Sequence, residues 1–328
     1  MVAGWMFRSS RPVAAGEEPG ADNDQNAETE FGAWHGRDDL PIASAARKAA
    51  ALRSGFMPRL PRPPRRRVLV VANQKGGVGK TTTTVNLAAA LCIHGLSVLV
   101  IDLDPQGNAS TALGVPHHRD VPSVYDVLMG EAGISDVAVP VADLPNLMCA
   151  PATIDLAGAE IDLVSLDQRE SRLGRALAAA DLEHFDYVFV DCPPSLGLLT
   201  VNALSAAGEV LVPVQCEYYA LEGLTQLLHT IELVRTRLNP RLAVSTILLT
   251  MYDGRTKLAE QVAQEVRRHF GPKVLRTTIP RSVRVSEAPS HGQTVLTYDP
   301  GSPGALSYLE AGRELARAGA EQLPTPAE

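Results

Sequence analysis

The sequence of 328 residues is poor in cysteine, in aromatic residues and in long apolar runs. Its four cysteines lie far apart, with no C-x-x-C pair and no histidine at zinc spacing, which is typical of a reduced, cytoplasmic protein. No apolar run approaches the ~18 residues that cross a bilayer, so no membrane-spanning helix is expected. An excess of positive charge is also absent. Because the formal net charge is −7, any surface for nucleic acid must be local, or must form in one functional state only.

Apolar residues nevertheless make up 45% of the chain, which is enough for a large core and excludes a wholly disordered or fibrous protein. The first 66 residues differ from the rest. Gly16–Glu30 is rich in Gly, Asp, Glu and Asn, and Met57–Arg67 reads MPRLPRPPRRR. Neither segment has helical or strand periodicity, so we expect a disordered extension over residues 1–66 and one folded domain over residues 67–328. The cluster Arg65–Arg67 is interpreted as a solvated linker, with a phosphate-attracting arm as the alternative.

From residue 67 onward, apolar runs of strand length alternate with helical patterns. Val68–Ala72 and Ser97–Asp102 are continuous apolar runs, as in strands that are buried on both faces. Between them Thr81–His94 is predicted to be a helix that Gly95 caps. Five further strands are expected, at Leu147–Ala150, Tyr187–Asp191, Glu209–Pro213, Ala243–Thr250 and Val274–Thr277. This alternation predicts a single α/β domain, with a mostly parallel, twisted sheet covered by helices on both faces.

A glycine-rich loop joins the first expected strand to the first expected helix. It reads Lys75-Gly76-Gly77-Val78-Gly79-Lys80-Thr81-Thr82. Glycines let successive backbone N–H groups point at phosphate oxygens, and the helix N-terminus adds the positive end of its dipole. Lys80 would then neutralise the β- and γ-phosphates, and the Thr81 hydroxyl would be a ligand for Mg²⁺. The loop carries an additional lysine, Lys75, at its start.

Two carboxylates end the second expected strand. Asp102 and Asp104 lie where the carboxyl ends of parallel strands face a ligand crevice. The two-residue period of a strand puts both side chains on the same side. One would hold the water shell of the metal, and the other would orient an attacking water molecule.

The segment KGGVGKTT resembles the deviant Walker A motif of the ParA/MinD group of P-loop ATPases. This resemblance implies an ATP-dependent homodimer in which Lys75 reaches the phosphates of the other subunit while Lys80 works in its own. DLDPQGN resembles the second motif of the family, which implies that Asp104 is needed for hydrolysis. Asp191, at the end of an apolar strand, resembles the Walker B aspartate that contacts Mg²⁺ through water.

Three branches of this group compete as interpretations of the chain. An electron-transfer ATPase needs paired thiolates for an iron–sulfur cluster, and neither Cys149 nor Cys192 lies in a cluster motif. A membrane-binding ATPase needs a C-terminal amphipathic helix with a basic face, whereas the C-terminal segment mixes arginine with glutamate. No membrane contact is therefore expected.

The third branch, DNA partition, has positive support. Residues 215–223, 251–256 and 279–292 resemble segments of chromosomal, Soj-like ParA proteins. The resemblance implies that Arg255 and Arg284 carry nonspecific binding to double-stranded DNA, and that Pro280 and Arg281 lie by the adenine of ATP. Because a dimer doubles these arginines, it adds phosphate contacts that one subunit lacks.

The expected protein is an ATPase with weak basal activity that partitions chromosomes or plasmids and is associated with the nucleoid in its ATP state. A ParB-like centromere-binding protein would be the partner that triggers hydrolysis. The alternative is a MinD-like or orphan ParA-like ATPase that positions another cargo on the membrane or nucleoid.

Overall fold

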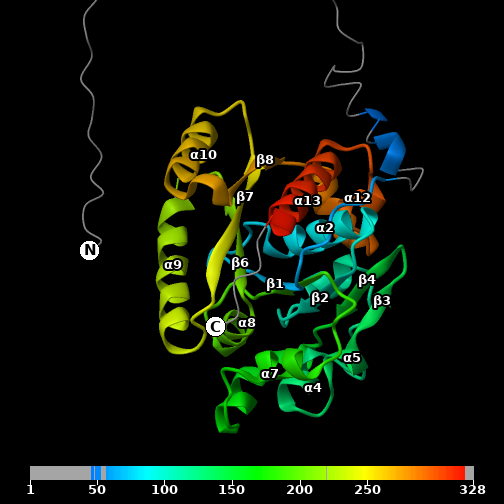
Figure 1. Cartoon of the computed structure of the whole chain (residues 1–328), viewed down its shortest axis with the longest axis vertical. Helices are drawn as coiled ribbons and strands as arrows, with labels where there is room; N and C mark the ends of the chain where they lie inside the picture. Colours follow the sequence, from blue (N-terminus) through cyan, green and yellow to red (C-terminus); the bar gives the residue numbers. More distant parts are fainter. Residues whose placement is uncertain (1–45, 48, 53–56, 219, 322–328) are drawn as a thin grey trace, which may run out of the picture. The chain divides into compact units, whose positions relative to one another are not determined.

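The computed structural model describes residues 46–47, 49–52, 57–218 and 220–321. Within them the strands are β1 (Arg67–Val71), β2 (Val98–Asp102), β3 (Val139–Val141), β4 (Leu144–Ala150), β5 (Tyr187–Asp191), β6 (Glu209–Gln215), β7 (Ala243–Tyr252) and β8 (Val274–Pro280). They form one sheet in the order β3-β4-β2-β5-β1-β6-β7-β8. Every neighbouring pair is parallel except β3 and β4. The predicted mostly parallel sheet is confirmed (Figure 1).

Helices cover both faces of the sheet, as predicted (Figure 1). One face packs against α2 (Lys80–Ile93), α3 (Asn108–Ala112), α12 (Val295–Tyr298) and α13 (Pro303–Glu321). The other packs against α4 (Val124–Met129), α5 (Ile134–Val137), α6 (Ala159–Asp162), α7 (Arg172–Ala179), α8 (Leu198–Ala206), α9 (Ala220–Arg237) and α10 (Lys257–Phe270). The short α11 (Val283–Glu287) follows β8. Alternate residues of each central strand enter the two cores, so the continuous apolar runs of the sequence are satisfied on both sides.

The strand expected at Tyr187–Asp191 has the predicted ends, and the other six differ only at their ends. The strand β3 was not predicted, because it is short, contains Pro140 and lies antiparallel at the sheet edge, where proline is tolerated. Gly95 caps α2 as expected. Its φ of 84° is one that glycine adopts at little cost, and its N–H donates to the carbonyl of Cys92 at 2.8 Å.

Arg67 departs from the linker interpretation of the arginine cluster. It begins β1, is 5% exposed, and donates to both carboxylate oxygens of Glu209 at 2.8 and 2.5 Å. A third bond goes to the carbonyl of Leu315 at 3.0 Å, and the guanidinium lies 5.5 Å from the ring centre of Tyr187. A bidentate, buried pair of this kind has a specific geometry. Arg67 therefore joins β1, β6 and α13 at the amino end of the sheet.

Residues 57–66 also differ from the prediction, because they pack on the domain. Leu60 donates its N–H to the carbonyl of His94 at 3.2 Å, and the ring Nδ1 of His94 lies 2.7 Å from the carbonyl oxygen of Pro58. Met57 and Leu60 contact the core that α2 and α13 share. The packed domain thus begins before residue 67. The remainder of the expected disordered extension, apart from a helical stretch within residues 46–52, lies outside the described residues.

None of the helices in the described part of the chain combines the length and the apolar character needed to cross a membrane.

Because α13 packs closely on α2, there is no space for a side chain at Gly312. A Cβ atom at this position would lie 2.8 Å from the Cβ of Ala90, which is fully buried. We expect Gly312→Val to lower the free energy of unfolding by about 2 kcal/mol or more, because the two helices must separate. Urea unfolding measures this change. Ala318→Val, on the exposed side of the same helix, is the control and should cost only about 0.6 kcal/mol. Equal effects of the two substitutions would contradict the packing argument.

Candidate active site

The predicted site residues lie at the carboxyl edge of the sheet. The phosphate loop follows β1, while β2 and β5 end at Asp102 and Asp191. These two aspartates are direct partners in the parallel register of β2 and β5. Because parallel strands end at the same edge, residues that are far apart in the sequence meet there.

The conformation of the phosphate loop depends on two glycines. Gly77 and Gly79 have φ angles of 74° and 88°, in the left-handed region that residues with a Cβ avoid. A Cβ at Gly77 would have no atom within 4 Å, so the space beside this part of the loop is open. The exposed backbone of Gly76 and Gly77 and the N-terminus of α2 offer N–H donors of the kind that bind phosphate.

Two side chains, one at the start of the loop and one on β7, hold the loop in place. The amide of Asn73 donates to the carbonyl of Pro213 at 2.8 Å, and its oxygen accepts the N–H of Lys75 at 3.0 Å. On the other side, the Thr250 hydroxyl donates to the carbonyl of Val78 at 2.8 Å. Neither Asn73 nor Thr250 was predicted as a site residue. A polar residue directly after a buried strand is the sequence signal that points to Asn73, whereas Thr250 lies in an ordinary apolar strand.

Lys80 is 7% exposed at the start of α2. Burial lowers the pKa of its ammonium group, and the carboxylates of Asp191 and Asp104 act against this shift. The lysine is thus a nearly buried cation among acidic groups.

Two hydroxyls of α2 hold the carboxylate of Asp191. Thr81 donates to one oxygen at 2.6 Å, and Thr84 donates to the other at 3.0 Å. Sequence reasoning missed Thr84, although residues three apart on a helix lie on one face and the run of four threonines contains this signal. The contact of Thr81 with Asp191 brings together two of the three predicted metal-site residues.

The third predicted metal-site residue, Asp102, is held from within the protein. It is fully buried, and one of its oxygens accepts both the N–H and the hydroxyl of Ser110 at 2.8 and 2.7 Å. The other oxygen lies 3.3 Å from the N–H of Asp104. Burial raises the pKa of both Asp102 and Asp191. The charge of Asp102 raises the pKa of Asp191 further, and the charge of Asp104 does the same for Asp102. Asp102 thus lies beside Asp191 with its own oxygens bonded within the protein. Ser110 is a further residue that the sequence pattern did not reveal.

Asp104 is nearly buried, at 7% exposure, but its side chain is less engaged. One oxygen accepts the N–H of Gln106 at 3.0 Å. Asp104 acts electrostatically on Lys80 and on Asp191, so it belongs to the same cluster of charges. Its carboxylate retains acceptor capacity for a water molecule.

Lys75 does not join this cluster. Its ammonium group lies 2.8 Å from a carboxylate oxygen of Glu217, just beyond β6, and the two side chains are 35% and 45% exposed. Gln215 also donates to Glu217. The lysine with the predicted role in a second subunit is therefore paired within its own chain.

The predicted DNA-binding arginines are exposed and paired with acids. Arg255 donates to both oxygens of Asp253 at 2.9 and 2.8 Å. Arg284 donates to Glu287 at 3.0 Å and lies 3.4 Å from Asp299. Exposed pairs of this type contribute little free energy, so phosphate groups can replace the carboxylates.

The predicted adenine-side residues follow the edge strand β8. Pro280 ends this strand as the register partner of Tyr252. The N–H of Arg281 donates to the carbonyl of Tyr252 at 3.4 Å, and the Arg281 side chain is exposed. These contacts hold the two residues beside the end of β7 and not against the phosphate loop.

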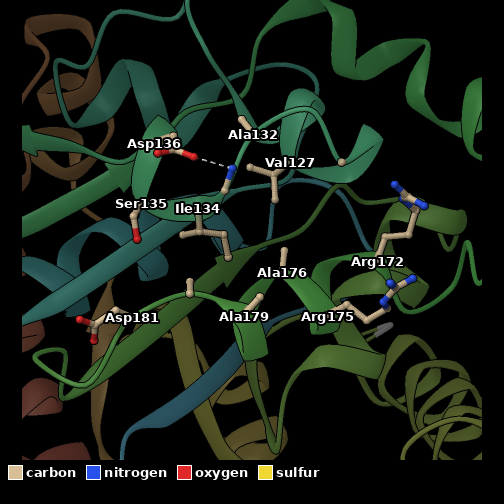
Figure 2. Close-up of a pocket in the computed structure, with 13 residues that line it drawn as sticks. Val127, Ala132, Ile134, Ser135, Asp136, Arg172, Arg175, Ala176, Ala179 and Asp181 are labelled. Carbon is tan, nitrogen blue, oxygen red and sulfur yellow. Dashed lines mark hydrogen bonds between the residues drawn. The ribbon is translucent and has the colours of Figure 1, made fainter.

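A separate cavity of about 650 Å³ lies between α4, α5 and α7, and none of the predicted site residues lines it. Figure 2 shows Ile134 and Ala176 in its middle, Arg172 and Arg175 at one end and Asp181 at the other. Arg172 donates to the carbonyls of Leu128 and Met129, which end α4. The cavity thus has an apolar floor, and one of its two arginines serves to cap a helix.

The buried carboxylates predict an unusual dependence of stability on pH. Because burial raises the pKa of Asp191 above its unfolded value, the folded protein binds more protons than the unfolded chain between these two values. The free energy of unfolding should therefore fall as the pH rises from near 5 to near 8. Asp191→Asn removes the buried ionisable group, so the free energy of unfolding of the variant should fall less over this pH range. Relative to the parent, the variant should gain about 1–3 kcal/mol of stability between the lower and the higher pH, measured by urea unfolding. Parallel pH profiles for the two proteins would contradict this assignment.

Comparisons with known proteins identify the family. A family model described as an AAA domain matches residues 66–244. The sporulation initiation inhibitor protein Soj of Bacillus subtilis is 53% identical over 253 residues, or 77% of this chain and 99% of Soj. The chromosome partitioning protein ParA of Caulobacter vibrioides is 56% identical over 250 residues, or 76% of this chain and 93% of ParA.

Solved structures show the same fold. The cobyrinic acid a,c-diamide synthase from Mycobacterium smegmatis with bound ATP analog and magnesium is 42% identical, with a TM-score of 0.66, over 76% of this chain and 94% of that one. The cell division ATPase MinD of Pyrococcus furiosus is 27% identical, with a TM-score of 0.63, over 76% of this chain and 98% of that one. The resemblance inferred from the loop and the carboxylates is confirmed: the chain belongs to the Soj/ParA family of chromosome-partitioning ATPases.

Proposed function

We propose that this protein is an ATP-driven partitioning ATPase that moves chromosomes or plasmids by binding DNA in its ATP state. The observation that carries the proposal is the cluster of lysine, threonine and aspartate side chains at the carboxyl edge of the sheet, next to the glycine loop. In it a nearly buried Lys80 lies among acidic groups, and Thr81 contacts Asp191. Relatives that are about half identical, from Caulobacter vibrioides, Myxococcus xanthus and Treponema pallidum, are named as chromosome-partitioning proteins, which supports the same task here.

The donor set fits a magnesium nucleotide. The hydroxyl of Thr81 and the carboxylate of Asp191 are hard oxygen donors of the kind that Mg²⁺ prefers, with Asp102 behind them. When bound, Mg²⁺ supplies positive charge against the phosphates. The desolvated, fully buried Asp191 is a group that a nearby cation would stabilise.

Each side chain has one role in this proposal. Backbone N–H groups of residues 76–82 bind the phosphates, and Lys80 neutralises the β- and γ-phosphates of its own subunit. Asp104 accepts a proton from the attacking water or orients it for in-line attack. Pro280 and Arg281 border the adenine. Turnover without a partner is slow, and a ParB-like protein accelerates it.

Dimerisation requires Lys75 to change partners. In the single chain Glu217 neutralises it, and in the dimer it reaches the phosphates of the second subunit. The pair with Glu217 is exposed enough that breaking it costs little, whereas a phosphate offers greater negative charge. The joined pair of subunits doubles Arg255 and Arg284 and binds duplex DNA without sequence preference. Hydrolysis then separates the subunits and releases the DNA.

Substitutions at Asp104 and Lys75 separate hydrolysis from dimerisation. We expect Asp104→Ala to retain ATP-dependent dimerisation and to lose hydrolysis by about 10²-fold or more, because the water is no longer oriented. Lys75→Ala should instead lose the ATP-dependent dimer and, with it, partner-stimulated hydrolysis. Phosphate release and light scattering in ATP–Mg²⁺ measure the two properties. An Asp104→Ala protein that hydrolyses ATP at the parental rate would overturn its assignment.

Binding to random-sequence duplex DNA tests the function itself. The parent should bind more tightly with ATP–Mg²⁺ than with ADP, and this gain should weaken steeply as salt increases. Arg255→Gln with Arg284→Gln should remove the ATP-dependent gain and leave ATP-dependent dimerisation intact. Anisotropy of labelled DNA gives both the affinity and the salt slope. Dimerisation without any ATP-dependent gain in DNA binding would favour a different cargo.

A further inference from the structure

The segment Met57–Arg66, which we call the arginine strap, repeats the triplet Pro-Arg-x three times. The triplets are Pro58-Arg59-Leu60, Pro61-Arg62-Pro63 and Pro64-Arg65-Arg66. The strap lies almost entirely before the region that the family model matches, because that match begins at residue 66. The role of the strap therefore follows from its own residues and not from the family match.

Burial along the strap has a period of three. Met57, Leu60 and Pro63 are half-buried against the domain, whereas Arg59, Arg62 and Arg65 are exposed, as are the prolines that precede them. A polyproline II helix has three residues per turn and rises about 3.1 Å per residue, so every third residue falls on one face. Arg59, Arg62 and Arg65 thus form a row of exposed side chains at every third position of the sequence, and the chain bends at Pro64 and Arg65.

The strap is held in place mainly by backbone and apolar contacts. Its anchors are the hydrogen bond from Leu60 to His94, the contact of Pro58 with the His94 ring, and the apolar packing of Met57. Proline restricts the unfolded chain, so fixing this segment costs less conformational entropy than fixing an ordinary loop. A charged row that is already ordered loses little more entropy on binding a partner.

The arginines of the strap also lack strong partners. Residues 47–67 include eight basic side chains and no acidic one. Within the described part of the chain, Arg59, Arg65 and Arg66 form no ion pair, and Arg62 lies 3.7 Å from Asp186 with its side chain 67% exposed. Arg255 and Arg284, by contrast, must first give up acidic partners.

From this row we infer that the strap is a second nucleic-acid surface, whose guanidinium groups bind backbone phosphates of duplex DNA without sequence preference and without need of a nucleotide. It goes beyond the proposed ATP-dependent surface and stands independently of it. Guanidinium forks match phosphate oxygens, and each neutralised phosphate releases counterions. An anionic lipid surface is the alternative partner for such arginines. Segments that bind membrane surfaces insert large apolar side chains, and the described strap exposes none. DNA is therefore favoured over lipid.

A triple variant tests the strap in the full-length protein. Arg59→Gln, Arg62→Gln and Arg65→Gln together should lower the affinity for random duplex DNA in the absence of nucleotide by about tenfold or more at low salt. They should also reduce the salt slope by nearly one per arginine. The matched control, Arg175→Gln with Arg237→Gln and Arg241→Gln, removes three exposed arginines elsewhere and should leave both quantities at the parental values. Anisotropy over a salt series measures them, and urea midpoints verify folding.

Replacing the same three arginines of the strap by lysine should retain most of the salt slope, because the charge remains. A glutamine variant with the parental slope and affinity would overturn the inference, and so would an equal loss in the control. Strap-dependent binding to phosphatidylserine vesicles, with no strap dependence on DNA, would overturn it in favour of a lipid surface. If a variant loses only the ATP-dependent gain in DNA affinity, that result bears on the proposed function and not on the nucleotide-independent binding by the strap.

Discussion

The carboxylates of Asp102 and Asp191 lie beside each other on neighbouring parallel strands, fully buried, and most of the site depends on this pair. Two desolvated negative charges in register destabilise a fold unless donors and cations surround them. The hydroxyls of Thr81, Thr84 and Ser110 supply the donors. The start of α2, and hence the phosphate loop, is positioned by the same contacts that keep the carboxylates satisfied.

This arrangement connects stability with nucleotide binding. A cation beside Asp191 would lower the electrostatic cost that burial imposes, so a magnesium nucleotide bound there would stabilise the edge of the sheet. Lys80 already neutralises part of this charge, and its own pKa is lowered by the burial that the site requires. In the isolated chain, Lys80 therefore offsets only part of the cost of burying these carboxylates.

Outside the site, positive charge occurs in two different settings on an acidic protein. Lys75, Arg255 and Arg284 are each held by a carboxylate of the same chain. Such exposed pairs reduce nonspecific attraction to phosphate while costing little to exchange. The arginine strap has the opposite character, because its charges are ordered by apolar and backbone contacts and have few acidic neighbours. The net charge of −7 conceals this difference, since it sums over surfaces that do not act together.

The fold class and the core of the site could be predicted from the sequence, because local patterns carry them. Apolar runs located seven of the strands, and the spacing of Lys75, Lys80 and Thr81 identified the phosphate loop before any contact was known. Supporting residues such as Ser110 and Thr250 could not be found in this way, and Asn73 showed only that a polar residue follows a buried strand. Their functions arise from hydrogen bonds to residues distant in the sequence or across a strand end, and a polar residue in an ordinary strand or helix gives no sign of its partner.

The same reasoning explains the misplaced boundary at the N-terminal side of the domain. Composition placed residues 57–66 in a disordered extension, because this proline- and arginine-rich segment has no strand or helix period. Its packing depends on contacts with His94, and the burial of Arg67 depends on Glu209 and on the carbonyl of Leu315 in α13. Short runs of residues determine the strands, the phosphate loop and its charged side chains. Which side chains are buried and which acids pair with which bases depends on the distant segments that the sheet brings together.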